Sequence, residues 1–209
     1  MLTTTPTTPG HSISRADAVS LWAFMAAGAA IALWVTWSAV ARIIEVLPNR
    51  DVAVLAPFAG TPAEAPIGPD GSPVTVELEQ AVLTVPELPI ASVWAIVIQQ
   101  VVLVVAVVAV VTALIWLSRN VARGVVFCRT NTALVSTAGI VALLGYFAVP
   151  FFGNMASNGA FAVLSEHTFD NVIMTLDPFA LVLAAFIVAL LSTVFAIGER
   201  LQRDTEGLV

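Results

Sequence analysis

The sequence is poor in charge and in metal-binding side chains. It has no lysine, one cysteine and two histidines, and charged residues make up only 11% of its 209 positions. The single cysteine, Cys128, excludes an internal disulfide, and since no second thiol or histidine lies near it in the sequence we expect a reduced thiol. Apolar residues make up 59% of positions, against about 45 to 50% in an average soluble domain. A lipid bilayer is therefore the expected solvent for most of the chain.

Four apolar stretches are long enough to cross about 30 Å of hydrocarbon as helices. With their flanking residues they predict membrane helices over residues 14–47, 92–118, 131–154 and 178–199. Ser92 and Asp177 are the expected start signals of the second and fourth helices. The first stretch imitates a secretory signal, but its length and its tryptophans favour a retained anchor. Residues 1–13 are rich in Thr and Pro, so we expect a disordered cytoplasmic tail there.

The arginines predict the orientation, because positive residues near span ends stay in the cytoplasm. Four spans put both termini on one side of the membrane. An N-in/C-in arrangement leaves Arg42 and Arg50 outside and places all the other arginines inside, namely Arg15, Arg119, Arg123, Arg129, Arg200 and Arg203. Most carboxylates fall in the first outer loop, and an acidic outer face argues against direct nucleic-acid binding on that side. The predicted fold is an all-α integral membrane protein with a small extracytoplasmic cap.

Two outer segments are expected to differ in structure. In the first, residues 48–91, Val74–Val85 alternates as a β-strand and residues 52–55 are a candidate partner, while residues 56–73 read as turns or irregular chain. A β-hairpin or small sheet of this size must pack on the helices or on another chain to be stable. In the second, residues 155–177, an interfacial helix is expected from the apolar residues near one face, which are Phe161, Leu164, Phe169, Val172, Ile173 and Leu176.

Polar side chains inside or beside the spans are the candidates for chemistry. Gln99 and Gln100 lie within the second span, where an amide either forms interhelical hydrogen bonds or lines a substrate site. Glu166, His167 and Asp170 are the nearest approach to a metal or acid–base cluster. His167 is displaced from the other two on a helix and further ligands are lacking, so a solvated loop is favoured. We predict no catalytic residues, no metal and no cofactor.

The inner loop, residues 119–130, and the tail, residues 200–209, carry most of the inner arginines. Arg119 and Arg123 share one face if the second helix continues inward, with Gly124 as its stop signal. Together the loop element RGVVFCRTN and the ending GERLQRDTEGLV resemble a family of bacterial membrane proteins catalogued as domain of unknown function 2975. The positions that carry the resemblance are Arg123, Gly124, Phe127, Asn131, Gly198, Leu201, Leu208 and Val209.

The resemblance implies four spans in the bacterial cytoplasmic membrane and a small cytoplasmic helix-turn-helix regulator, beside which members of the family are often encoded. It assigns no activity. By this analogy the tail and the Arg loop form a docking patch for such a regulator, and a helix that continues past Ile197 would pair Glu199 with Arg203. The alternative is that these arginines only anchor the fourth span. The predicted patch comprises Arg119, Arg123, Arg129, Arg200, Leu201, Arg203 and Leu208.

Three functions are compatible with these features. The first is a non-enzymatic sensor or regulatory partner, with the lipid bilayer and a cytoplasmic DNA-binding regulator as its partners and no direct contact with nucleic acid. The second is a structural subunit or assembly factor of a membrane complex. The third is a small transporter or immunity-type protein, which would need a polar cavity around Gln99, Gln100 and Pro150. Small residues at i, i+4 spacing, such as Gly28 and Ala32, support a tight bundle or a homo-oligomer.

Overall fold

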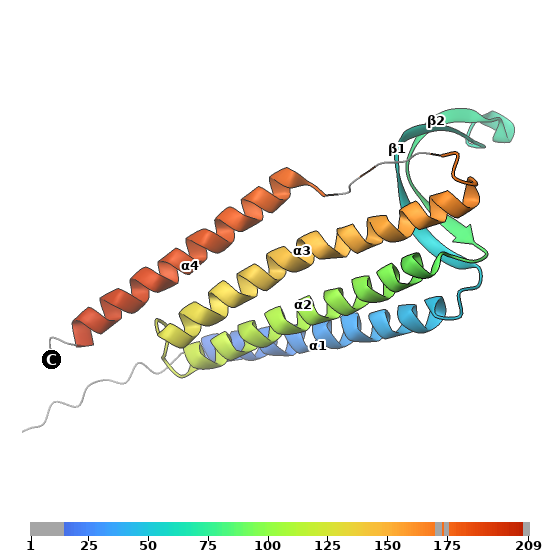
Figure 1. Cartoon of the computed structure of the whole chain (residues 1–209). Coiled ribbons are helices and arrows are strands. Elements are labelled where there is room, and N and C mark those ends of the chain that lie inside the picture. Colours follow the sequence, from blue (N-terminus) through green and yellow to red (C-terminus); the bar gives the residue numbers. More distant parts are fainter. Residues whose placement is uncertain (1–14, 170–172, 174–175, 207–209) are drawn as a thin grey trace, which may run out of the picture.

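The computed structural model describes residues 15–169, 173 and 176–206. Four helices are each long and apolar enough to cross a membrane, as the sequence predicts. They are joined to a two-stranded antiparallel hairpin (Figure 1). The elements are α1 (Arg15–Val46), β1 (Val52–Ala65), β2 (Val74–Val85), α2 (Ile90–Ala122), α3 (Arg129–Leu164) and α4 (Pro178–Glu206). The expected tail, residues 1–13, lies outside the described residues.

The helices form an open layer and not a closed bundle. Each packs mainly on its neighbour in sequence, α1 on α2, α2 on α3 and α3 on α4. Figure 1 shows α4 at one edge of the layer, with the hairpin over one end and the α2–α3 loop at the other. We call these the hairpin end and the arginine end. All four helices expose large apolar side chains, as expected for helices that cross a membrane.

Small residues let α2 and α3 approach closely. A Cβ atom added at Gly145 would lie 2.8 Å from the Ala106 methyl group, and one added at Gly159 would clash with Ser92. Ser92 is therefore a packing residue inside α2, which begins at Ile90, and its predicted role as a start signal is wrong. The corresponding prediction for α4 is confirmed, because Asp177 Oδ1 accepts a hydrogen bond of 2.9 Å from the Phe179 amide.

Three helices run further than expected, and α2 extends from the predicted 92–118 to Ile90–Ala122. α3 has 36 residues, about 54 Å at 1.5 Å per residue, and it includes residues 155–164. The separate interfacial helix expected over 155–177 is not found among the described residues, since residues 165–169 are non-helical and several later ones lie outside the description. The chain continues α3 because Ala156, Ala160 and Phe161 bury their side chains at the hairpin end. α4 likewise continues past residue 199 to Glu206.

The hairpin is longer than the sequence indicated. β1 includes residues 56–65, which were expected to be irregular, and pairs with β2 from Val52↔Val85 to Ala65↔Val74. A register shift between Pro57 and Thr61 interrupts the ladder. Proline is tolerated here because each strand of a two-stranded ribbon has one free edge, where no amide donor is needed.

The hairpin packs on the helices, as its marginal intrinsic stability requires. Phe58 of β1 makes an edge-on contact with Phe161 of α3, with ring centroids 4.9 Å apart. Asn49 joins the two ends of the hairpin, because its side chain donates to the Leu88 carbonyl and accepts from the Leu88 amide, each at 2.9 Å. The buried cluster beneath comprises Val46, Val52, Val54, Val85, Leu88, Val93, Ala95, Ile96, Ala156 and Ala160.

Candidate functional site

The loop at the arginine end is a defined structure. Gly124, with φ of 80°, follows the last turn of α2. Its amide donates to Val121 O, while the Val125 amide donates to Asn120 O. This pair of bonds is the Schellman arrangement, in which glycine is favoured because the left-handed conformation costs it little. The predicted stop signal at Gly124 is therefore confirmed.

Asn131 holds this loop from within. Its side chain is fully buried, and Nδ2 donates to Val125 O at 2.9 Å and to Val126 O at 2.8 Å. Its Oδ1 accepts a hydrogen bond of 2.7 Å from Asn120 Nδ2. The Asn131 amide thus donates to two loop carbonyls that lie outside the helices and so lack the usual backbone donors of a helix. A polar residue at the start of an apolar span was the signal for this role, but sequence spacing alone does not identify its partners.

The end of α4 packs against this loop. The Phe127 and Phe195 rings lie 5.7 Å apart between centroids, and any side chain at Gly198 would clash with the Phe127 ring. Glu199 Oε2 accepts a hydrogen bond of 3.0 Å from Thr132 Oγ1 at the start of α3. These contacts join the α2–α3 loop and the end of α4 into one surface, which we call the loop–tail surface.

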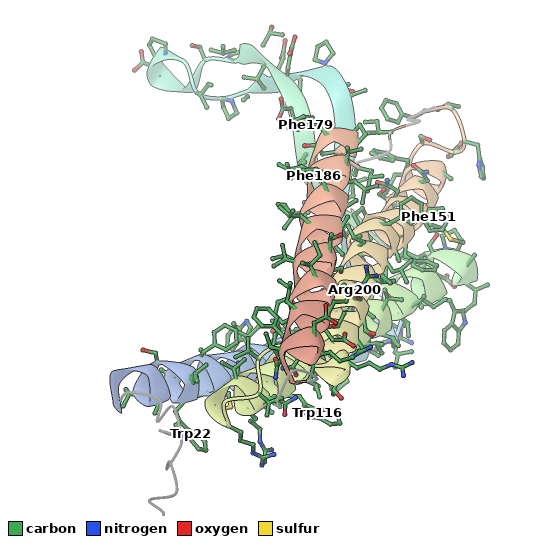
Figure 2. The ribbon with its side chains drawn as sticks, turned by 90° about the vertical axis from the view of Figure 1, so that its left-hand side faces the viewer. Trp22, Trp116, Phe151, Phe179, Phe186 and Arg200 are labelled. Carbon is green, nitrogen blue, oxygen red and sulfur yellow. The ribbon has the colours of Figure 1, made fainter. Side chains whose placement is uncertain are left out.

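The predicted pairing of Glu199 with Arg203 is confirmed. Arg203 Nη2 lies 2.6 Å from Glu199 Oε1, and the Glu199 side chain is only 16% exposed. The carboxylate therefore binds both α3 and the next turn of its own helix. Arg129, Arg200 and Leu201 of the predicted patch are exposed beside these contacts, whereas Leu208 lies outside the described residues. Figure 2 shows Phe179, Phe186 and Arg200 following one another along α4.

The structure places the Arg119 and Arg123 side chains away from Phe127 and the end of α4. Arg119 lies on the last turn of α2, Arg123 directly follows that helix, and both line a hollow of about 610 Å³ between α1 and α2. A second hollow, of about 410 Å³, is lined by the same two arginines together with Trp116. α4 packs against α3, on the other side of the layer from α1 (Figure 1). The predicted patch is thus two surfaces, one facing α1 and one at the end of α4.

Gln99 and Gln100 are not brought together. Gln99 Nε2 donates a hydrogen bond of 3.0 Å to Val149 O, next to Pro150 in α3. Gly153 makes room for this amide, since a Cβ there would lie 2.7 Å from Nε2. Gln99 also lines a hollow of about 250 Å³ beneath the hairpin, which Arg42 and Asn154 share. Gln100 is half-buried and does not line that hollow.

Arg42 was missed as a structural residue by sequence reasoning. Its guanidinium donates to Ala53 O of β1 and lies 2.9 Å from Glu45 Oε1. It therefore joins α1 to the hairpin.

Among the described residues, no group of three His, Cys, Asp or Glu side chains is placed to hold a metal ion. Of the three residues considered as a metal or acid–base cluster, Glu166 and His167 lie in a turn and have positive φ. The third, Asp170, falls outside the described residues.

Comparisons of the chain with protein-family models, with curated proteins and with solved structures find no match. The resemblance to the family catalogued as domain of unknown function 2975 therefore stays a prediction.

Proposed function

We propose that this chain is a non-enzymatic, multi-pass protein of a bacterial cytoplasmic membrane that acts as a sensor or regulatory partner. In this proposal its loop–tail surface binds a small cytoplasmic helix-turn-helix regulator. The observation that carries the proposal is the contact of Glu199 and Gly198 with Thr132 and Phe127. It gives the end of α4 a fixed place beside the loop, so that a partner meets one preformed surface.

The chemistry of this surface suits a protein partner. Leu201 is 63% exposed on the part of α4 that follows the apolar span, and Arg200 is exposed next to it. An exposed leucine beside arginines fits a partner that offers an apolar pocket with an acidic rim. The N-in/C-in orientation puts this surface in the cytoplasm, where the arginine distribution favours it.

α3 is the element that would carry a signal between the two ends of the layer. It contacts the hairpin through Phe161 and the tail through Thr132. A ligand or strain at the hairpin end that tilts or rotates α3 would displace Thr132 from Glu199. The regulator is bound when Glu199 contacts Thr132 and is released when α4 has lost this contact. The end of α4 thus acts as a two-state switch.

Co-purification with the regulator tests the docking proposal. The intact chain and an Arg200→Gln/Leu201→Ala variant are expressed in separate cultures at equal levels. Each is then purified in mild detergent. We expect a small DNA-binding protein to be recovered with the intact chain and at least about tenfold less of it with the variant, the size expected when a buried anchor is lost.

The matched control is Arg50→Gln/Leu55→Ala, which makes the same pair of changes at the hairpin end, where both residues are exposed. It should retain the partner. Equal loss from both variants would assign the effect to folding or insertion. Recovery of no soluble protein with the intact chain would overturn the docking proposal.

A subunit of a membrane complex is the second candidate, and the open layer favours it. α4 packs mainly on α3, and large side chains such as Phe179 and Phe186 are 75% and 64% exposed. Such faces serve equally for lipid and for neighbouring helices. This candidate predicts that the same membrane proteins accompany the intact chain and both variants. Transport has less support, because the hydrogen bond of Gln99 to Val149 O gives that amide a role in helix packing.

A further inference from the structure

α1 and α2 separate at the arginine end and leave a hollow between them. They pack closely near Gly28, where an added Cβ would lie 3.3 Å from Val111 Cγ1. From there toward the start of α1 the hollow of about 610 Å³ opens. Apart from two arginines its lining is apolar or aromatic, comprising Ala18, Leu21, Trp22, Met25, Ala26, Ile115, Ala122, Arg119 and Arg123.

The two arginines are close enough to bind one anion together. Arg119 lies on the last turn of α2 and Arg123 is the residue that caps this helix, and both side chains line the same two hollows. Both are exposed, and neither forms an ion pair with a carboxylate among the residues whose side chains are described. Guanidinium groups match the geometry of phosphate oxygens and form charge-assisted hydrogen bonds with them. Nothing in the described part of the protein neutralises this pair, so an external anion is its natural counterion.

The arginines also line a second hollow, of about 410 Å³, which lies along α2 itself. Ile115 and Trp116 supply its apolar lining, and Thr112, Asn120, Arg119 and Arg123 complete it. Ile115 and the two arginines thus belong to both hollows. A ligand with one anionic group and two apolar chains would fill this arrangement, with its charge at the shared arginines and one chain in each hollow.

Tryptophans mark the depth of the site in the membrane. Trp22 and Trp116 are 72% and 55% exposed and lie at the same end of the layer (Figure 2). Exposed tryptophans collect at the level of lipid headgroups. Arg119 follows Trp116 by three residues, about 4.5 Å along the helix. The arginines therefore lie at headgroup level, while Met25 and Ile115 lie toward the hydrocarbon.

We propose that the hollow between α1 and α2, together with the neighbouring hollow on α2, forms a binding site for an anionic phospholipid, whose phosphate is held by Arg119 and Arg123 and whose acyl chains occupy the two hollows. The site is separate from the loop–tail surface and does not depend on a protein partner. Basic pockets between membrane helices commonly bind lipid headgroups. In the N-in/C-in orientation the site faces the cytoplasmic leaflet.

Lipid titration of the purified chain tests this site. The full chain is delipidated in a non-ionic detergent and titrated with phosphatidylglycerol or phosphatidylcholine of the same chain length, with binding followed by native mass spectrometry. We expect one tightly bound phosphatidylglycerol and weaker binding of phosphatidylcholine. Arg119→Gln/Arg123→Gln should reduce the affinity for phosphatidylglycerol about tenfold or more, since charge-assisted hydrogen bonds are lost.

Two further variants separate a specific site from general surface charge. Arg129→Gln/Arg200→Gln removes the same charge at the same end of the layer and should leave phosphatidylglycerol binding unchanged. Ala26→Phe fills the first hollow without changing charge and should weaken binding of the lipid. Glycerol phosphate, which has the anionic group but no acyl chains, should not displace the bound lipid at equal concentration.

Other outcomes overturn the proposal. Equal affinity for the two lipids, or an equal loss in both arginine variants, would leave only non-specific attraction to anionic surfaces. If Ala26→Phe binds phosphatidylglycerol with unchanged affinity, no acyl chain lies in the first hollow. If glycerol phosphate displaces the bound lipid, the site recognises a free phosphate and not a phospholipid. The Ala26→Phe arm and the lipid comparison decide the matter even if the double arginine variant does not fold.

Discussion

Thr132 Oγ1 donates a hydrogen bond of 3.0 Å to Glu199 Oε2, which links the first turn of α3 to the end of α4. The same carboxylate binds Arg203, so one largely buried side chain fixes both the position of the helix end and the direction of its last turns. Within the part of the chain that the structure describes, α4 packs mainly on α3. The position of its last turns therefore depends on this packing and on the contacts of Glu199.

Glu199→Ala is expected to destabilise the packing of α4 on α3. The change removes the carboxylate that Thr132 and Arg203 contact, and Thr132 keeps only its longer bond to Cys128 O. A hydrogen bond to a charged group contributes about 1.5–3 kcal/mol, whereas the exposed ion pair with Arg203 contributes about 1 kcal/mol or less. We expect a lower midpoint of thermal unfolding in detergent. Asp204→Ala is the control, because it removes the same charge from an exposed position. A midpoint that falls equally in both variants would show that net charge, and not the contact with Thr132, matters.

Asn131→Leu is expected to open the loop at the arginine end. The carbonyls of Val125 and Val126 and the Asn120 amide would lose their partner, and each buried group left unpaired costs about 1–3 kcal/mol. Limited trypsin digestion measures this opening, because Arg123 and Arg129 lie on either side of the loop. We expect faster cleavage at both sites than in the intact chain.

The matched change for this experiment is Asn120→Ala, which removes one of the three hydrogen bonds of Asn131 and leaves the two to the loop. Its cleavage rate should fall between those of the intact chain and Asn131→Leu. If trypsin cleaves the intact chain and Asn131→Leu at the same rate, the loop does not depend on this amide.

The spans and the hairpin were predictable because each has a local signature. Hydropathy over about 20 residues identifies a membrane helix, and the alternation in Val74–Val85 identifies a strand. The length of β1 was not predictable, because Pro57 and Pro62 are unfavourable in strands and only pairing with β2 keeps them extended. The end of α3 was misplaced for a similar reason, since burial of Phe161 against Phe58 is a contact distant in sequence.

The candidate site was only partly predictable. Helical spacing predicted the pair of Glu199 with Arg203, because their contact lies within one helix. The same spacing could not show that Arg119 and Arg123 face α1 while Arg200 lies on α4, because that division depends on how the helices are ordered in the layer. Asn131 was visible as a polar residue in an apolar context, but its partners are carbonyls, which every residue carries.

The contact of Gly153 with Gln99 predicts a double-mutant result. Gly153→Ala places a methyl group 2.7 Å from the present position of Gln99 Nε2, so the amide must move and lose its bond to Val149 O. We expect a loss of about 0.5–1.5 kcal/mol, the net contribution of one hydrogen bond. In a Gln99→Ala background the same substitution should cost less, because the amide is no longer there. Denaturant titration in mixed micelles measures the four species, and strictly additive effects would contradict the contact.

The single cysteine allows the orientation to be tested directly. Cys128 precedes α3 at the arginine end and is half-buried. The N-in/C-in orientation puts it in the cytoplasm, so a membrane-impermeant maleimide should label it only after the cells are permeabilised. Thr75→Cys in a Cys128→Ser background moves the thiol to an exposed position in β2, where intact cells should be labelled. The reverse pattern would put the hairpin end in the cytoplasm. The loop–tail surface would then face away from any cytoplasmic regulator, and the docking proposal would fail, whereas the proposed lipid site would remain and would open to the opposite leaflet.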